Sequence, residues 1–396
     1  MFINSILNFF NNLNFLQYNK IYVAYSGGID STVLLYVLSK IKKDNIYPVY
    51  VNHGIKNYSQ ICEKHCENFV TSLNLKLIKI NIKMLNENIN CLESRFRIGR
   101  YKSFFKLMSK KSILVLAHHE QDLIETYLFR VFKGSGYNGL SSIRPVNNVF
   151  GIKCIRPFLI FNKHQIYKYA IFNKLYWCED PTNKNKFIAR NYIRYQILKN
   201  IFMFWPNAQK SMSRSVRLIQ IQNQVLNHFI KKILIKLKGR KCNSLNIKQL
   251  LKENINLQLI LIRSWLNINK ITMLTLKQIN HLYVEVILSK RNTASIYHIN
   301  NIIIKKYDST LFLLKKKKYN RKYHYKTLKK ENEIKLKKDQ LFLPCNIKSK
   351  NFITIEFKIF SNKVKRKMQK KRVPPWERKV TPLIFYKKEF IDILYK

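Results

Sequence analysis

The chain has 396 residues, which is enough for two or three domains with sizeable cores. Its 74 lysine and arginine residues outnumber 21 acids, and the net charge of +53 makes a polyanion the expected partner, most often a nucleic acid. No apolar run reaches roughly 18 residues and no long basic amphipathic stretch stands out, so we expect no membrane partner. Seven scattered cysteines fit a reducing, cytoplasmic compartment.

Residues 1–200 alternate helical and strand patterns, which predicts an α/β fold with a parallel sheet. The strand expected at 112–117 is apolar almost throughout, so we expect it in the centre of that sheet. The other strands are expected at 21–25, 47–54 and 75–80, and helices within 1–20 and at 29–43, 59–73, 91–101 and 162–173.

A glycine-containing loop follows the first strand, with the sequence Ser26-Gly27-Gly28-Ile29-Asp30-Ser31. Glycines allow close approach of the backbone, and the unpaired first amides of the next helix favour an anion. Two serine hydroxyl groups add donors, and Asp30 could hold a magnesium ion that bridges phosphate oxygens. An ordinary capped turn is the alternative, but the complete string after an apolar strand favours a phosphate site, although no Walker-type Gly-Lys-Ser/Thr is present.

The strand expected at 112–117 is followed by His118 and His119, and a helix is expected to begin there. Asp122 and Glu125 lie three residues apart, so both carboxylates face one side of that helix. Such a pair could bind magnesium, hold an ammonium group or accept a proton; the alternative is an acidic first turn stabilised by the helix dipole. The adjacent histidines favour a functional role. His53 follows another strand and is either a packing residue or part of a nucleotide pocket.

Two pairs of arginines share helix faces. Arg190 and Arg194 lie four residues apart, a spacing that suits a phosphate clamp. Arg97 and Arg100 lie three apart, and a solvated helix face is the simplest interpretation of that pair. The CxxxC segment at 62–66 places two thiols on one helix face, where packing is favoured over metal binding.

The second half of the chain has a different composition, since only Gly239 of nine glycines lies beyond residue 151. Residues 315–338 are strongly basic with interleaved aromatics, and form either a solvated linker or an RNA contact. Helices are expected over 207–290 and short strands over 297–314. A strand from 352, a run over 363–371 that leads into 372–378, and a strand pair over 382–394 predict a small α+β module. We therefore expect three domains, at 1–200, 201–325 and 326–396.

Five strings resemble the bacterial tRNA(Ile)-lysidine synthase family, a branch of the N-type ATP pyrophosphatases, or PP-loop enzymes. They are the loop at 26–31; Ala117-His118-His119 with Asp122, Glu125 and Thr126; Arg130 with the glycines at 134–139; Asp180-Pro181-Thr182-Asn183 with Arg190-Asn191-Tyr192-Ile193-Arg194; and Val373-Pro374-Pro375-Trp376-Glu377-Arg378. The chain departs from the family pattern at Gln121, where an acid is usual, at Leu123, where glutamine is usual, and at Phe96, where a small residue is usual.

The resemblance implies a PP-loop domain with an adenine-nucleotide α-hydrolase-like fold, then a helical middle domain and a small α+β C-terminal domain. It also implies a ligase that uses ATP and Mg²⁺. The enzyme would adenylate carbon 2 of cytidine 34 in a CAU-anticodon tRNA(Ile) and attach free L-lysine, releasing AMP and pyrophosphate. The product, lysidine, changes the codon read from AUG to AUA. The assembly could be a dimer.

The resemblance also assigns residues to roles. ATP would contact Ser26, Gly27, Gly28, Ile29, Asp30 and Ser31, with Asp30 also holding the metal. The catalytic set would be Asp30, Asp122, Glu125 and Arg190, and the substrates would contact His53, Arg97, Arg100, His118, His119 and Arg194.

Two other functions remain open on the sequence. One is a tRNA thiolase of the same fold, which would need a reactive cysteine, and the chain has no CxxC pair. The other is a non-catalytic RNA-binding relative, which the missing acid at Gln121 brings into consideration.

Overall fold

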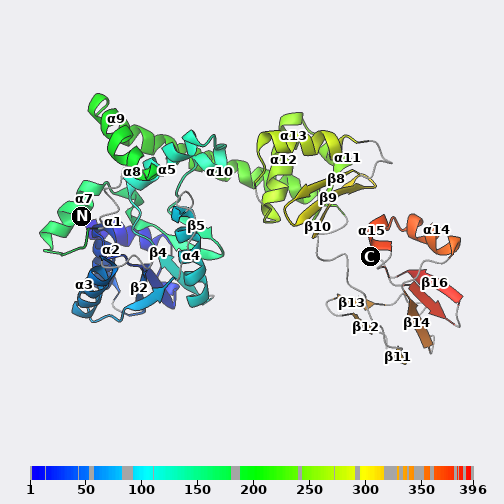
Figure 1. Cartoon of the computed structure of the whole chain (residues 1–396), viewed down its shortest axis with the longest axis horizontal. Helices are drawn as coiled ribbons and strands as arrows, with labels where there is room; N and C mark the ends of the chain where they lie inside the picture. The colour runs from blue at the N-terminus through cyan, green and yellow to red at the C-terminus, as the bar shows by residue number, and fades with distance from the viewer. Residues whose placement is uncertain are drawn as a thin grey trace. The chain divides into compact units, whose positions relative to one another are not determined.

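The computed structural model forms two compact units, Met1–Leu226 and Asn227–Lys396, and each is described by itself (Figure 1). The domain boundaries expected near residues 200 and 325 stay predictions. The structure describes residues 2–13, 15–42, 44–52, 58–82, 92–109, 111–179, 188–239, 243–271, 273–289, 295–315, 328–329, 333–336, 339–342, 352–356, 361–378, 381, 383–386 and 389–393.

The described part of the first unit contains a six-stranded sheet with the order β3-β2-β1-β4-β6-β5. Five strands run parallel, as predicted, and the strand over 112–115 is interior. The exception is one edge strand, β5, which pairs antiparallel with β6. The strands are β1 Lys20–Ala24, β2 Ile46–Asn52, β3 Ile78–Asn81, β4 Ser112–Val115, β5 Val146–Val149 and β6 Ile152–Ile155.

A tight hairpin turn produces the antiparallel edge. Phe150 and Gly151 both have positive φ angles, +50° and +87°. Two successive residues of this kind match the right-handed twist of paired antiparallel strands. Because the second turn residue is glycine, it adopts this backbone without side-chain strain.

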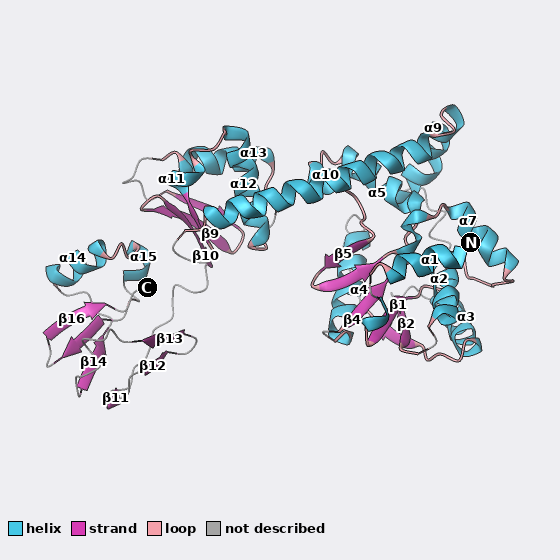
Figure 2. Ribbon diagram, turned by 180° about the vertical axis from the view of Figure 1, so that it is seen from behind, coloured by secondary structure: helices cyan, strands magenta, loops and turns pink. Residues whose placement is uncertain are grey.

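Helices cover both faces of this sheet (Figure 2). Alternation along β1 sends Ile21 and Val23 into one core, while Tyr22 lies in the other. The first core includes side chains of α1, α2, α3 and α7, and the second includes Tyr101 and Phe104 of α4. The helical segments are α1 Phe2–Asn11, η1 Phe15–Gln17, α2 Ile29–Ile41, α3 Tyr58–Ser72, α4 Leu92–Leu107, α5 Glu120–Phe132, α6 Tyr137–Leu140, η3 Pro157–Ile160, α7 Lys163–Phe172, α8 Ala189–Tyr192, η5 Ile193–Ile197, α9 Leu198–Phe204 and α10 Ala208–Lys236.

The second unit begins with helices and an antiparallel sheet. Helices over 207–290 and strands over 297–314 were both expected, and both are present in the described residues. A short additional strand, β7, pairs with β10 and was not predicted. The elements are β7 Ser244–Asn246, α11 Ile247–Leu250, α12 Ile255–Ile268, α13 Leu276–Leu282, η6 Tyr283–Ile287, β8 Ile296–Ile299, β9 Ile302–Tyr307 and β10 Thr310–Lys315.

The end of the chain forms a small α+β module, as predicted. Val364 and Met368 of its longer helix pack against Leu383 and Ile393 of the terminal strand pair. The elements are β11 Leu328–Lys329, β12 Glu333–Leu336, β13 Asp339–Phe342, β14 Phe352–Glu356, α14 Asn362–Lys370, α15 Pro375–Arg378, β15 Leu383–Tyr386 and β16 Glu389–Ile393. None of the helices in the described ranges combines the length and hydropathy that crossing a bilayer requires.

Candidate active site

The loop after β1 is closed by its own serines. The Ser26 backbone amide donates to Ser31 Oγ at 3.2 Å, and the two hydroxyl oxygens lie 3.1 Å apart. Ser31 Oγ also donates to the Gly28 carbonyl oxygen at 2.9 Å. Gly28 is the N-cap of α2 and provides no capping side chain. The loop therefore has a defined shape and presents the amino end of a 13-residue helix, which favours a phosphate group.

Three thiols pack behind this loop. Gly27 has a φ angle of +80°, and a Cβ atom there would lie 2.8 Å from Cys66 Sγ. Cys62 and Cys66 are buried, which confirms the packing prediction for this pair. Burial raises the pKa of Cys66 to about 12 and that of Cys178 to about 12, so both thiols stay protonated at neutral pH. Among the described residues, no group of three or more side chains is arranged as a metal site.

His119 connects the loop with the acidic helix. Its Nε2 atom lies 3.8 Å from Asp30 Oδ2 and 3.6 Å from Asp122 Oδ2. Its Nδ1 atom accepts from the Gln121 amide at 3.2 Å, while its own amide donates to Asp122 Oδ2 at 3.0 Å. Because Nδ1 accepts from a backbone amide, Nε2 is the ring nitrogen that faces the two carboxylates. The histidine is only 2% exposed, so this orientation is fixed by packing.

The two carboxylates beside His119 have different electrostatic environments. Burial raises the pKa of Asp30, and the nearby His119 opposes that shift. Asp30 Oδ1 is buried and has no hydrogen-bond partner among the described residues. Burial also acts to raise the pKa of Asp122, but His119 and Arg190 outweigh it and hold that pKa below its usual range. Asp122 is therefore a carboxylate at neutral pH, and its side chain is 13% exposed.

Glu125 is fully buried and holds two arginines. Arg194 donates to its two carboxylate oxygens at 2.6 and 3.0 Å, and Arg190 donates from Nε at 3.2 Å. Arg190 Nη2 also reaches Asp122 Oδ1 at 3.4 Å and Thr126 Oγ1 at 3.3 Å. Burial lowers the pKa of Arg194, but its bond with Glu125 outweighs that effect and keeps the pKa above the usual range. Glu125 thus fixes the two arginines for which a phosphate-binding role is predicted.

His118 faces a buried arginine, Arg156, that was not among the predicted site residues. Arg156 is 2% exposed and donates from Nε to His118 Nδ1 at 3.2 Å. Its Nη1 atom donates to the Arg144 carbonyl oxygen at 3.0 Å and to Asn147 Oδ1 at 2.6 Å. Burial lowers the pKa of His118 to about 3, so the imidazole is neutral. The only local signal was Arg-Pro directly after an apolar strand.

The remaining predicted residues lie outside this cluster or outside the described ranges. Arg97 and Arg100 are exposed on α4, and the Arg97 guanidinium lies 5.9 Å from the Tyr101 ring centre. Arg100 is near enough to help lower the pKa of His118. His53 and the string at 180–183 lie outside the described residues. The structure therefore brings together the loop at 26–31 with the histidines, acids and arginines of α5 and α8–η5.

Replacing Gly27 with alanine is expected to destabilise the loop. The new Cβ would meet Cys66 Sγ at 2.8 Å, and the φ angle of +80° is strained for alanine. We expect a loss of roughly 1–3 kcal/mol in unfolding free energy, measured by urea denaturation without nucleotide. Gly28→Ala is the matched control, because its Cβ would meet nothing closer than 3.6 Å. Equal losses in both variants would contradict this interpretation of the loop.

Removing the Glu125 carboxylate is expected to cost about 3–5 kcal/mol, because Glu125→Ala removes the acceptor of three hydrogen bonds from two partly buried arginines and leaves them only longer contacts with Asp122. Glu125→Gln keeps the shape and part of the hydrogen bonding, so its loss should be smaller. Chemical denaturation of both variants measures the difference. Wild-type stability in Glu125→Ala would show that the pairing does not hold α5 to the segment over 189–197.

The free energy of unfolding is expected to decrease as the pH is lowered, because of His118. The pKa of His118 in the folded chain, about 3, lies below the ordinary value of 6.5. Between these two pH values the imidazole is protonated in the unfolded chain and neutral in the folded chain. Its contribution is complete above pH 6.5 and declines by up to about 1.4 kcal/mol per pH unit below that value. Urea midpoints between pH 7 and 4.5 should be flatter for His118→Asn than for wild type. His164→Asn, at an exposed position, should keep the wild-type slope.

The chain is similar in sequence to known proteins along nearly all of its length. A family model described as "PP-loop domain" matches residues 1–201, and one described as "TilS substrate C-terminal domain" matches residues 351–394. The chain is 33% identical to the tRNA(Ile)-lysidine synthase of Buchnera aphidicola subsp. Baizongia pistaciae (strain Bp), over 98% of this chain and 92% of that protein.

Two other relatives carry the same name. The protein of Buchnera aphidicola subsp. Acyrthosiphon pisum (strain APS) is 30% identical over 99% of this chain and 92% of its own length. The protein of Haemophilus influenzae (strain PittEE) is 28% identical over 92% of this chain and 91% of its own length. With a PP-loop domain over half its length and a 33% identical relative spanning nearly all of it, the chain belongs to the tRNA(Ile)-lysidine synthase family.

Proposed function

We propose how this ATP-dependent tRNA(Ile)-lysidine synthase carries out its reaction. ATP first adenylates the oxygen on carbon 2 of cytidine 34 in a CAU-anticodon tRNA(Ile), and pyrophosphate leaves. The amino group of free L-lysine then attacks carbon 2, and AMP leaves. The observation that supports this proposal is the contact series from Asp30 through His119 to Asp122, with spacings of 3.8 and 3.6 Å.

In the first step, the residues must bind a triphosphate and stabilise charge on the leaving pyrophosphate. The loop at 26–31 offers hydroxyl groups and the amino end of α2 to the phosphate oxygens. Arg190, whose side chain is 29% exposed, can donate to the reacting phosphate while Glu125 fixes its direction. His119 holds Asp30 and Asp122 in their relative positions.

The residues fit a magnesium ion at Asp30. Asp30 Oδ1 is buried without a partner among the described residues, which leaves a hard oxygen ligand available. Magnesium commonly binds one or two protein carboxylates together with substrate phosphates. When bound, the ion would neutralise charge on the phosphate oxygens of ATP.

In the second step, a carboxylate must hold the positively charged lysine. Asp122 is suited to this role because it is ionised, partly exposed and beside the loop. Glu125 has both oxygens engaged with arginines, so we assign it to positioning them rather than to lysine binding. His118 and Arg194 lie beside Asp122 at the same edge of the sheet.

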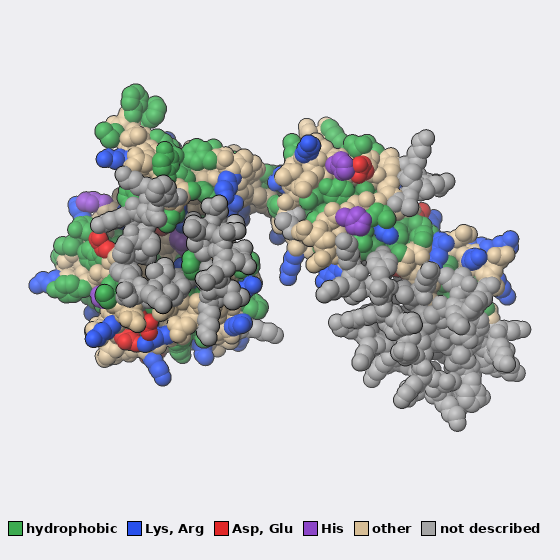
Figure 3. Space-filling view, in the orientation of Figure 1, with side chains coloured by type: hydrophobic (Ala, Val, Ile, Leu, Met, Phe, Trp, Pro, Cys, Tyr) green, Lys and Arg blue, Asp and Glu red, His purple; other side chains and the backbone are tan. Residues whose placement is uncertain are grey.

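The tRNA must present a splayed base and a long polyanionic backbone. In the space-filling view, lysine and arginine side chains are spread over the described surface, while acidic side chains appear at few places (Figure 3). Together with the net charge of +53, this supports broad backbone contact outside the active site. A dimeric assembly stays a prediction.

The proposal is tested by incorporation of labelled lysine into a tRNA(Ile) transcript with a CAU anticodon. Incorporation and pyrophosphate release should both require ATP, and a transcript with uridine at position 34 should accept no lysine. Absence of label with the correct transcript would refute the proposal. Cys62→Ser, Cys66→Ser and Cys178→Ser should keep turnover if folded, whereas a thiolase would lose it.

Asp122→Asn is expected to weaken lysine use selectively. Loss of the charge should raise KM for lysine by at least about tenfold, the scale of one charged hydrogen bond, with a smaller change in KM for ATP. Gln121→Ala is the matched control, since only the backbone of Gln121 contacts His119. An unchanged KM for lysine in Asp122→Asn would assign the ammonium group to another partner.

A further inference from the structure

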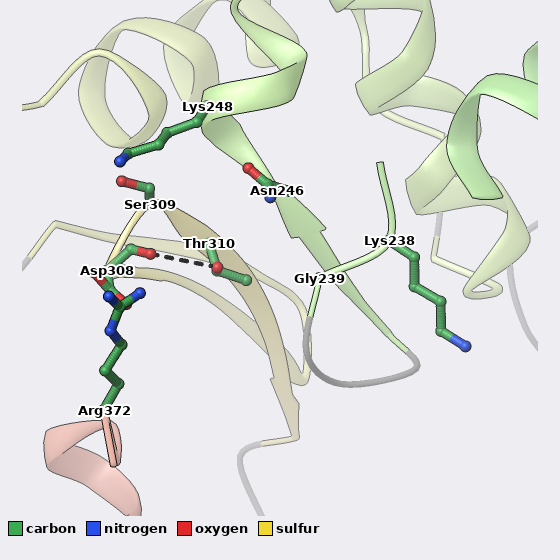
Figure 4. A pocket seen from close by; sticks show the side chains of 8 residues that line it. All are labelled: Lys238, Gly239, Asn246, Lys248, Asp308, Ser309, Thr310 and Arg372. Atoms are coloured by element: carbon green, nitrogen blue, oxygen red, sulfur yellow. Dashed lines mark hydrogen bonds and ion pairs between the residues drawn. The ribbon is translucent and has the colours of Figure 1, made fainter. Parts of the chain in front are cut away.

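The second unit contains a polar pocket that the proposed chemistry does not use. It has a volume of about 350 Å³, and Figure 4 shows it at the turn between β9 and β10. Every lining residue is polar, charged or glycine: Lys238, Gly239, Asn246, Lys248, Asp308, Ser309, Thr310 and Arg372. Such a lining is suited to a small charged group rather than to an apolar ligand.

The backbone of the pocket is shaped by a tight turn and by one glycine. Asp308 and Ser309 have φ angles of +44° and +59°, which turn β9 back into β10. A Cβ atom at Gly239 would lie 2.4 Å from Ser244 Oγ and 2.8 Å from Thr310 Cγ2. The single glycine beyond residue 151 therefore lies where the backbone must pass closely over β7 and β10.

One wall of the pocket comes from the C-terminal module. Trp376 packs edge-on against Tyr307 and Phe312, with ring centres 6.0 and 5.6 Å away. Lys305 Nζ lies 5.3 Å from the Trp376 ring centre, and Arg378 Nη2 donates to the Tyr307 hydroxyl oxygen at 3.3 Å. The string at 373–378 is thus a docking element against the β9–β10 hairpin.

This docking places the guanidinium group of Arg372 in the lining of the pocket. Arg372, just before the docking string, places Nη1 3.1 Å from Asp308 Oδ2. The pair neutralises the one acid in the lining. Lys238 and Lys248 form no ion pair with any described residue. Lys248 extends toward Ser309, whereas Lys238 points away from the other side chains (Figure 4).

We propose that this pocket binds a phosphodiester group of the tRNA backbone, with Lys248, Ser309 and Arg372 as its donors. Lysine, arginine and hydroxyl groups are the side chains that most often bind nucleic-acid phosphates. The volume accommodates one phosphate with part of a ribose. A free phosphate shares the same chemistry, but the strongly basic chain and its tRNA substrate favour the backbone as the source. The proposal rests on the tRNA-binding part of the proposed function.

The test is tRNA affinity as a function of salt, measured on the full chain. Lys248→Gln should weaken tRNA binding about fivefold and lower the slope of log K against log salt by about 1. Ser309→Asp, which places a carboxylate where the hydroxyl lies, should weaken binding further. Lys252→Gln, at an exposed lysine outside the pocket lining, is the matched control and should bind like wild type.

Lysidine formation and a phosphate probe separate the remaining outcomes. In Lys248→Gln, KM for tRNA should rise while kcat and KM for ATP stay unchanged.

Wild-type affinity and salt slope in both pocket variants would overturn the pocket proposal without affecting the ligase assignment. If inorganic phosphate protects wild type but not Lys248→Gln from unfolding and tRNA affinity is unaltered, the pocket takes free phosphate and the proposal is wrong. If wild type forms no lysidine yet the variants lose RNA affinity, the ligase proposal fails and the pocket stands.

Discussion

Glu125 has no exposed surface, and an unpaired carboxylate in such a place would be very costly. Its two oxygens accept three hydrogen bonds from Arg190 and Arg194, which lie 65 and 69 residues further along the chain. The bidentate contact with Arg194 fixes that guanidinium in one plane. One buried charge thus ties helix α5 to the segment over 189–197 and fixes the orientation of both arginines.

The sheet explains why these groups meet. β1 and β4 are adjacent and parallel, so the loop at 26–31 and the histidines after β4 leave the sheet at the same edge. His119 occupies the space between them and caps α5 with its own side chain. The site consequently combines two kinds of carboxylate. Asp30 has an unpartnered oxygen and a raised pKa, whereas Asp122 is held ionised by its cationic neighbours.

The absent acid at position 121 leaves this arrangement intact. Gln121 contributes its backbone amide to His119, a contact that any residue except proline could make. Asp122, in contrast, uses its side chain in the capping box and toward both arginines. The thiols behind the loop also argue for a ligase rather than a thiolase, because burial keeps Cys66 and Cys178 protonated.

The sequence by itself determined the features that depend on neighbouring residues. The glycine loop, the apolar strands and the helix starting after Asn162 are local patterns, and each formed close to its predicted position. Only the tertiary structure decided the partners of buried polar groups. Glu125 proved to anchor the two arginines, Arg156 proved to orient His118, and Trp376 proved to dock the C-terminal module on the β9–β10 hairpin. A buried charge or aromatic ring needs a specific partner, and that partner lies far away in the chain, where no local spacing records it.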